Sequence, residues 1–149
     1  MPADFAKIEL LDRLYKLRRD SRRLSASIIT TYSINLPFYE DVILRHLQAA
    51  GSRLNVVLVD AGELAKSFLD ESTCPRRAGR DYLLLPMRAG GAFHPKIIAL
   101  FSDAGMRIAV GSHNLTEAGC GRNPIVCWQI SVSREVRSNL QCATDCPHV

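Results

Sequence analysis

The sequence predicts an α/β domain with a mixed, mostly parallel central sheet flanked by helices. Runs of β-branched and aliphatic residues alternate with segments of helical apolar spacing, an order typical of α/β layers. Residues 56–59 are apolar at four consecutive positions, as in a strand buried on both faces. The chain has 149 residues, 47% hydrophobic and 23% charged, which is typical of one globular domain that buries about 70% of its unfolded surface.

Helices and strands are expected along the whole chain. Residues 5–18 carry apolar side chains at nearly helical spacing and predict an amphipathic helix. The expected strands, rich in β-branched or aliphatic residues, are 25–32, 54–59, 82–86, 96–101, 106–110 and 125–132. The other expected helices are 38–50, which follows Asn35 and Pro37 and stops at Gly51, then 63–69, a short turn at 115–118, and 133–142.

One hydrophobic core is expected, because no internal repeat or low-complexity segment divides the chain. We divide the sequence into an N-terminal amphipathic and basic segment, 1–24, a main domain, 25–142, and a frayed tail, 143–149. No apolar run approaches the ~20 residues that span a bilayer. The N-terminus lacks the basic start and apolar block of a secretory signal. The sequence therefore predicts no membrane insertion and a cytoplasmic location.

The cysteines are expected to be reduced thiols, because five is an odd number and their spacing forms no regular framework. Cys142, Cys146 and His148 are residue types that bind zinc, but three ligands at a chain end make a weak site. We predict no metal and no other cofactor.

Basic residues are unevenly distributed, although the net charge is only +4. One cluster comprises Lys16, Arg18, Arg19, Arg22 and Arg23, and the other comprises Arg76, Arg77, Arg80 and Arg88. The first cluster also has a simpler interpretation, as the solvated C-terminal end of a helix whose dipole favours cations. Basic clusters without a membrane segment favour a polyanion over a bilayer lipid, so nucleic acid is the expected partner.

The segment 93–123 carries the polar residues that indicate chemistry. His94 and Lys96 are two positions apart at the start of an expected strand, where alternate residues face the same side. Residues 102–105 predict a tight turn, so the returning strand would bring residues 111–114 back beside His94. An imidazole, an ammonium, a hydroxyl and a carboxamide, without a carboxylate cluster, suit a phosphate better than a metal.

At these residues the sequence resembles the phospholipase D superfamily, whose motif reads His-x-Lys, often followed by Asp, and then Gly-Ser-x-Asn. The matching residues are His94, Lys96, Gly111, Ser112 and Asn114. Phe101 stands where the Asp is usual, so the segment looks more like the His-Lys-Asn variant of tyrosyl-DNA phosphodiesterases and bacterial phospholipase D-like proteins. Asn123 resembles the Glu that many members carry after the Asn. The resemblance covers one half-domain with a single motif.

The resemblance implies a metal-independent phosphodiesterase that acts through a covalent phosphohistidine. His94 would be the nucleophile, which splits one difficult displacement into two easier ones. Lys96 and Asn114 would stabilise charge on the nonbridging oxygens. The same resemblance assigns substrate binding to Gly111, Ser112 and Asn123.

Two questions stay open at this point. Superfamily members supply a general acid with a second His-x-Lys motif, whereas this sequence holds one. The chain would therefore form a homodimer with a shared active site, or be one half of a longer enzyme. The alternative function is a noncatalytic phosphate- or DNA-binding module derived from the same fold. His113 is expected to support the site or face solvent, and His46 to lie on a helix surface.

Overall fold

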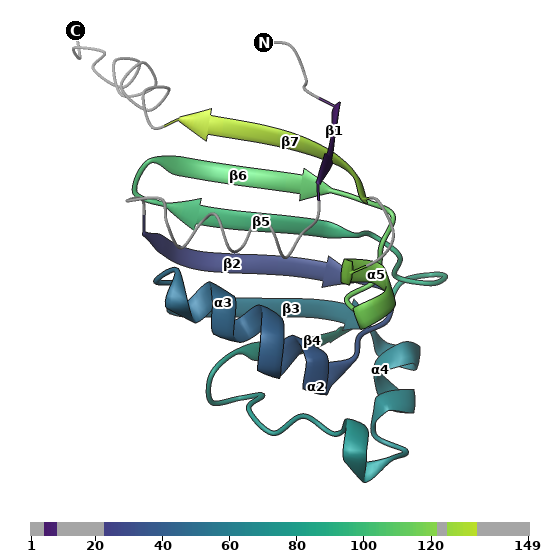
Figure 1. The fold of residues 1–149 in the computed structure, drawn as a ribbon. Helices are drawn as coiled ribbons and strands as arrows, with labels where there is room; N and C mark the ends of the chain where they lie inside the picture. Colours follow the sequence, from purple (N-terminus) through teal and green to yellow (C-terminus); the bar gives the residue numbers. More distant parts are fainter. Residues whose placement is uncertain (1–4, 9–22, 122–124, 134–149) are drawn as a thin grey trace, which may run out of the picture.

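A single mixed sheet organises this protein in the computed structural model, which describes residues 5–8, 23–121 and 125–133. Within these residues seven strands lie in the order β1-β7-β6-β5-β2-β3-β4 (Figure 1). The strands are β1 (Phe5–Ile8), β2 (Leu24–Thr31), β3 (Leu54–Asp60), β4 (Leu83–Met87), β5 (Ile97–Ser102), β6 (Gly105–Val110) and β7 (Ile125–Ser133). The expected strands of the main domain are confirmed to within two residues at each end.

The helices are short and connect the strands. Among the described residues, the longest helical stretch comprises α2 (Leu36–Phe38), a π-helical turn η1 (Tyr39–Ile43) and α3 (Leu44–Ala49). Asn35 caps its start by accepting a hydrogen bond from the Phe38 N–H at 3.0 Å, and Gly51, with a φ of 103°, follows its end. The others are α4 (Ala61–Ser67), a 3₁₀ turn η2 (Glu71–Thr73) and α5 (Glu117–Gly121). None of the helices in the described ranges is long and apolar enough to cross a membrane.

The sheet is mixed, as predicted, but its parallel part is smaller than expected. Parallel pairing joins β2 to β3 and β3 to β4, whereas β5, β6, β7 and β1 all pair antiparallel to their neighbours. The helical crossovers after β2 and β3 allow parallel pairing, but the tight turn between β5 and β6 enforces a hairpin. The predicted turn at 102–105 is confirmed, with Gly105 at a φ of 132°.

The predicted N-terminal helix is wrong for residues 5–8, which form β1. This strand pairs antiparallel with β7, and Phe5 lies opposite Trp128. Hydrogen bonding along the sheet satisfies the backbone of this segment, so a long-range pairing overrides its helical apolar spacing. Residues 9–18 and 134–142, where the rest of that helix and a last helix are predicted, lie outside the described residues.

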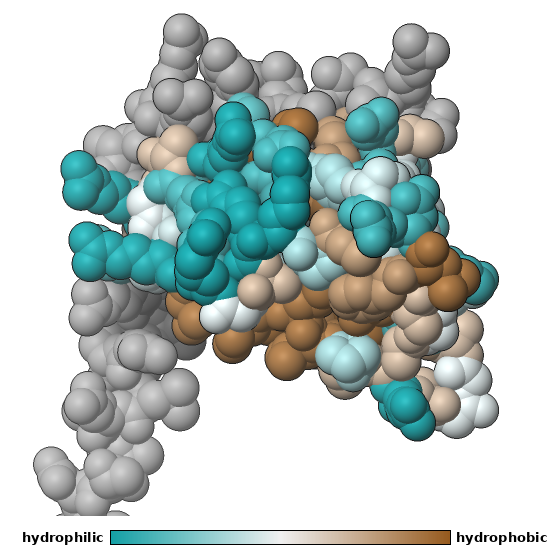
Figure 2. Space-filling model, turned by 90° about the horizontal axis from the view of Figure 1, so that it is seen from below, coloured by the Kyte–Doolittle hydropathy of each residue, from teal (hydrophilic) through white to brown (hydrophobic). Residues whose placement is uncertain are grey.

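The main core lies between the helical stretch 36–49 and one face of β2 and β3. Alternate strand residues on this face are buried, among them Ile29, Val57 and Val59. They pack with helical side chains that are at most 1% exposed: Leu36, Tyr39, Ile43, Leu44 and Leu47. Seen from below, on the side of β4, an apolar area of the surface adjoins a hydrophilic one (Figure 2).

Candidate active site

The predicted site residues that the structure describes lie at the end of the sheet where the parallel strands β2 and β3 terminate. The segments 93–96 and 111–114 reach this end because β5 begins there and β6 ends there. Figure 1 shows α5, which follows the second segment, at the same end of the sheet. Ligands of open α/β sheets bind outside the carboxyl ends of parallel strands, and the motif occupies that position.

His94 and Lys96 contact each other directly. The Nζ atom of Lys96 lies 2.9 Å from His94 Nδ1 and 3.1 Å from Nε2. Both residues precede β5, which begins at Ile97, so the contact comes from the loop and not from the strand alternation that we expected. His94 is exposed, whereas Lys96 is half-buried, and this burial lowers the pKa of Lys96.

Asp60, at the end of β3, holds the loop that leads to His94. Its Oδ2 atom accepts a hydrogen bond from the Phe93 N–H at 2.9 Å. Its Oδ1 atom caps α4 by accepting from the Gly62 N–H at 2.9 Å and the Glu63 N–H at 3.1 Å. The hydrogen bonds from Phe93, Glu63 and Gly62 lower the pKa of Asp60. One carboxylate thus joins a helix N-terminus to the His94 loop.

The second half of the motif is bonded to the first through the backbone. The Gly111 N–H donates to the Lys96 carbonyl at 3.0 Å, which confirms that the hairpin returns this segment beside the His-x-Lys segment. Ser112 Oγ lies 3.3 Å from His113 Nδ1. Within the described residues, the buried Asn114 Oδ1 and His113 Nε2 atoms have no hydrogen-bond partner. Asn123 lies outside the described residues.

Tyr32 contacts His94, and the sequence analysis missed it. The two rings lie 4.7 Å apart at an angle of 44°. The negative charge of Glu63, together with the interaction of its carboxylate with the Tyr32 hydroxyl, raises the pKa of Tyr32. Asp60 was missed for the same reason as Tyr32: neither is linked to position 94 by any spacing in the sequence. Their position at the ends of predicted strands was the available signal.

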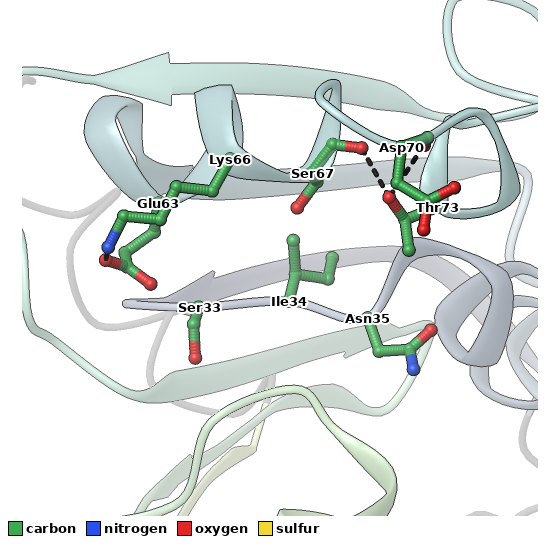
Figure 3. Close-up of a pocket in the computed structure, with 8 residues that line it drawn as sticks. All are labelled: Ser33, Ile34, Asn35, Glu63, Lys66, Ser67, Asp70 and Thr73. Carbon is green, nitrogen blue, oxygen red and sulfur yellow. Dashed lines mark hydrogen bonds and ion pairs between the residues drawn. The ribbon is translucent and has the colours of Figure 1, made fainter.

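A cavity of about 330 Å³ is lined by Glu63 and Lys66 of α4 and by the residues that follow Tyr32 (Figure 3). It lies between α4 and residues 33–35, and Thr73 lies at one end. The Thr73 hydroxyl oxygen is 2.7 Å from the Ser67 carbonyl oxygen and 2.9 Å from that of Asp70, so its one proton is shared between them. The motif residues do not line this cavity. Tyr32 interacts with Glu63 of the cavity wall and contacts the His94 ring, so it links the cavity wall to the motif.

The arginines of the loop 76–80 are paired with carboxylates. Arg76 Nη2 lies 2.6 Å from Asp41 Oδ2, and both Arg77 and Arg80 contact Asp81. These pairs neutralise much of the second basic cluster. Arg88 is exposed in the loop between β4 and His94. Of the first cluster, only Arg23 lies within the described residues.

The described polar side chains of the motif include no group of metal ligands. Over the described ranges, no three His, Cys, Asp or Glu side chains are grouped closely enough to hold a metal ion. Cys142, Cys146 and His148 fall outside those ranges. The donors on the motif side chains are the Lys96 ammonium and the His94 imidazole, and such groups suit the oxygens of a phosphate.

Comparison with solved structures places the fold. The yeast tyrosyl-DNA phosphodiesterase matches with 20% identity over 86% of this chain and 31% of its own, with a TM-score of 0.52. The chain has a phospholipase D-like fold. The polyphosphate kinase of Porphyromonas gingivalis shares it with 9% identity over 95% of this chain and 22% of the kinase, with a TM-score of 0.58.

Nuc from Salmonella typhimurium, a phospholipase D family member, matches with 20% identity, over 88% of this chain and 82% of Nuc, with a TM-score of 0.49. No protein-family model matches the sequence, and a search of curated proteins finds no match. This phospholipase D-like chain spans less than a third of the yeast enzyme.

Proposed function

We propose that this phospholipase D-like domain is a metal-independent phosphodiesterase that acts through a phosphohistidine on His94, with nucleic acid as substrate. The observation that carries this proposal is the contact of Lys96 with both ring nitrogens of His94, at 2.9 and 3.1 Å. A ring nitrogen of an exposed imidazole attacks phosphorus, an N–P bond forms, and the P–O bond to the leaving group breaks. Water then attacks phosphorus and releases the imidazole.

Lys96 and Asn114 stabilise the phosphate oxygens in this proposal. An entering phosphate takes over the contact that the Lys96 ammonium makes with the ring, in which only the unprotonated ring nitrogen accepts a hydrogen bond. Partial burial of Lys96 strengthens its electrostatic effect, because water screens the charge less. The backbone hydrogen bond from Gly111 to Lys96 holds the segment that leads to Asn114 beside Lys96.

The reaction also needs an acid for the leaving group, and we propose that a second His-x-Lys motif supplies it. The sequence contains one such motif, so the second comes from a homodimer partner or from another half of a longer enzyme. The yeast enzyme, of which this chain spans 31%, is consistent with the second arrangement. A twofold dimer would bring together two copies of the motif edge.

Nucleic acid is the substrate that we propose, because a protein of this fold is a tyrosyl-DNA phosphodiesterase. The exposed Arg88 lies six residues before His94 in the same loop, where it can contact a neighbouring phosphate. The paired arginines of the loop 76–80 contribute less, since their charges are already neutralised.

A covalent intermediate tests the proposal. The protein is incubated with bis(p-nitrophenyl) phosphate in EDTA, denatured at alkaline pH, and analysed by mass spectrometry for a phosphorylated adduct on His94. We expect the adduct and nitrophenolate release in the wild type, and neither in His94→Ala. His46→Ala is the matched control, because it removes an imidazole from α3, away from the motif. Hydrolysis that EDTA abolishes and a divalent ion restores would contradict the proposal.

A noncatalytic phosphate- or DNA-binding module is the second candidate. The single motif and Phe101 in place of the usual Asp favour it. Such a module would bind a labelled oligonucleotide in a His94-dependent way without any adduct or product release. Mixing wild-type and His94→Ala subunits distinguishes the assemblies, because a shared dimeric site loses turnover in proportion to the mixed dimers.

A further inference from the structure

We infer that Thr30 and Thr31, the last two residues of β2, are positioning residues that hold the His94–Lys96 segment at a set distance from Asn114. This inference rests on the proposed function, since it concerns the geometry of the same site. Neither hydroxyl belongs to the motif. Each one instead bonds to the backbone of a different half of the motif.

Thr30 holds the first half. Its Oγ1 atom donates to the Pro95 carbonyl at 3.1 Å and accepts from the Ile97 N–H at 2.9 Å. These two backbone groups flank Lys96 on both sides. A hydroxyl has one donor and two acceptor positions, so a single side-chain atom fixes the backbone on either side of the lysine.

Thr31 holds the second half. It is 1% exposed, and its Oγ1 atom donates to the Ser33 carbonyl at 2.7 Å and accepts from the Leu115 N–H at 3.0 Å. The Leu115 N–H belongs to the peptide unit that follows Asn114. The Leu115 carbonyl in turn accepts from the Asn35 N–H at 3.0 Å, which ties the same segment to the start of α2.

The geometry of strand β2 links the hydrogen bonds of Thr30 to those of Thr31. Successive side chains of a strand point to opposite faces, so the adjacent threonine hydroxyls bond to two different segments, Thr30 to the backbone at the start of β5 and Thr31 to the Leu115 N–H. The backbone between them is fixed by pairing with β3 and β5. The two motif halves are therefore bonded to adjacent residues of one strand, and this fixes their relative position. The next residue of the chain, Tyr32, contacts the His94 ring.

The residue type supports this role. A valine has nearly the same shape as a threonine but no hydroxyl. At position 30 it would leave the Ile97 N–H without its side-chain acceptor, and at position 31 it would leave the Leu115 N–H with only the Ser33 carbonyl, 3.2 Å away. The branched Cβ atom also restricts χ1, which directs Oγ1 more firmly than a serine would. Productive catalytic geometry is narrow, and a misplacement of about 1 Å can lower a rate about 100-fold.

The test compares Thr30→Val and Thr31→Val with Thr30→Ser and Thr31→Ser. Ser25→Ala is the matched control, because Ser25 Oγ makes a similar bond, to the Phe101 carbonyl at 3.3 Å, at the other end of β2. We expect kcat for bis(p-nitrophenyl) phosphate to fall about 10- to 100-fold in each Val variant, with KM little changed. The Ser variants should recover most of the rate, and Ser25→Ala should keep all of it.

Amide hydrogen exchange gives a readout that does not depend on activity. Thr30→Val should accelerate exchange mainly at Ile97, and Thr31→Val mainly at Leu115. Normal kcat in both Val variants, with an inactive His94→Ala, would overturn this inference and leave the proposed function intact. If Thr31→Val does not fold, Thr30→Val still tests the inference, because Thr30 is only half-buried.

The inference can also be separated from a failure of the proposed function. If the wild type forms no phosphohistidine, the proposed function is wrong, and inorganic phosphate becomes the probe. NMR titration should then show phosphate affinity about tenfold weaker in the Val variants than in Ser25→Ala, the cost of one displaced hydrogen-bonding group. Equal affinity in all variants would overturn the inference.

Discussion

Replacing Glu40 by alanine should lower the free energy of unfolding by about 3–5 kcal/mol. The carboxylate is 0% exposed. Its Oε1 atom accepts hydrogen bonds from the N–H groups of Arg76 and Arg77, each at 2.9 Å, and from the Tyr82 hydroxyl at 3.1 Å. These bonds hold the loop after η2 against the helical stretch 36–49.

The magnitude follows from the donors that alanine leaves behind. A hydrogen bond to a charged group contributes about 1.5–3 kcal/mol, and a buried donor without an acceptor costs about 1–3 kcal/mol. Three donors share one carboxylate, so their contributions do not add in full, and the loss falls below their sum. Glu40→Gln keeps an oxygen for the same donors and should cost about 1–2 kcal/mol.

Urea unfolding followed by circular dichroism measures these differences. The control is Arg45→Ala, which removes an exposed i,i+4 pair with Asp41, 3.6 Å long, and should change stability by about 0.5 kcal/mol or less. Because a domain of this kind is stable by only about 5–15 kcal/mol, the Glu40→Ala loss should be plain. A loss below about 1 kcal/mol would refute the view that this carboxylate anchors the loop.

Three further outcomes are expected. A Cβ atom at Gly119 would lie 2.3 Å from the Asn114 carbonyl oxygen, so Gly119→Ala should displace Asn114 and lower the nitrophenolate release rate at least about tenfold, without unfolding the protein in a thermal melt. The pKa of Asp60 is lowered in the folded state, so its stabilising bonds are present above its unfolded pKa of about 3.9 and are lost as the pH falls through the folded pKa. Amide exchange at Phe93 should therefore accelerate as the pH falls through that folded pKa. In Asp60→Asn, exchange at Phe93 should be fast at every pH and show no such step. Burial raises the pKa of Cys120 to about 11, so iodoacetamide at pH 8, mapped by mass spectrometry, should modify it only after unfolding.

Local patterns in the sequence were sufficient to predict most strands and the return of residues 111–114 to the His94–Lys96 segment. Runs of β-branched residues define β2 and β3 because such side chains fit a pleated, packed surface. Gly51 marks the end of a helix because its φ is positive. The hairpin of β5 and β6 is equally local, since a tight turn joins the strands, and it was enough to predict that Gly111 returns beside Lys96.

The tertiary structure alone decided what surrounds the motif. Tyr32 meets His94, and Asp60 meets Phe93, across more than 30 positions of sequence. Residues 5–8 form a strand for a similar reason, since their partner is β7. Such contacts depend on the order of strands in the sheet, and the free energy that selects this order comes from packing and hydrogen bonding between distant segments. The residues next to Tyr32 or Asp60 in the sequence therefore do not predict these contacts.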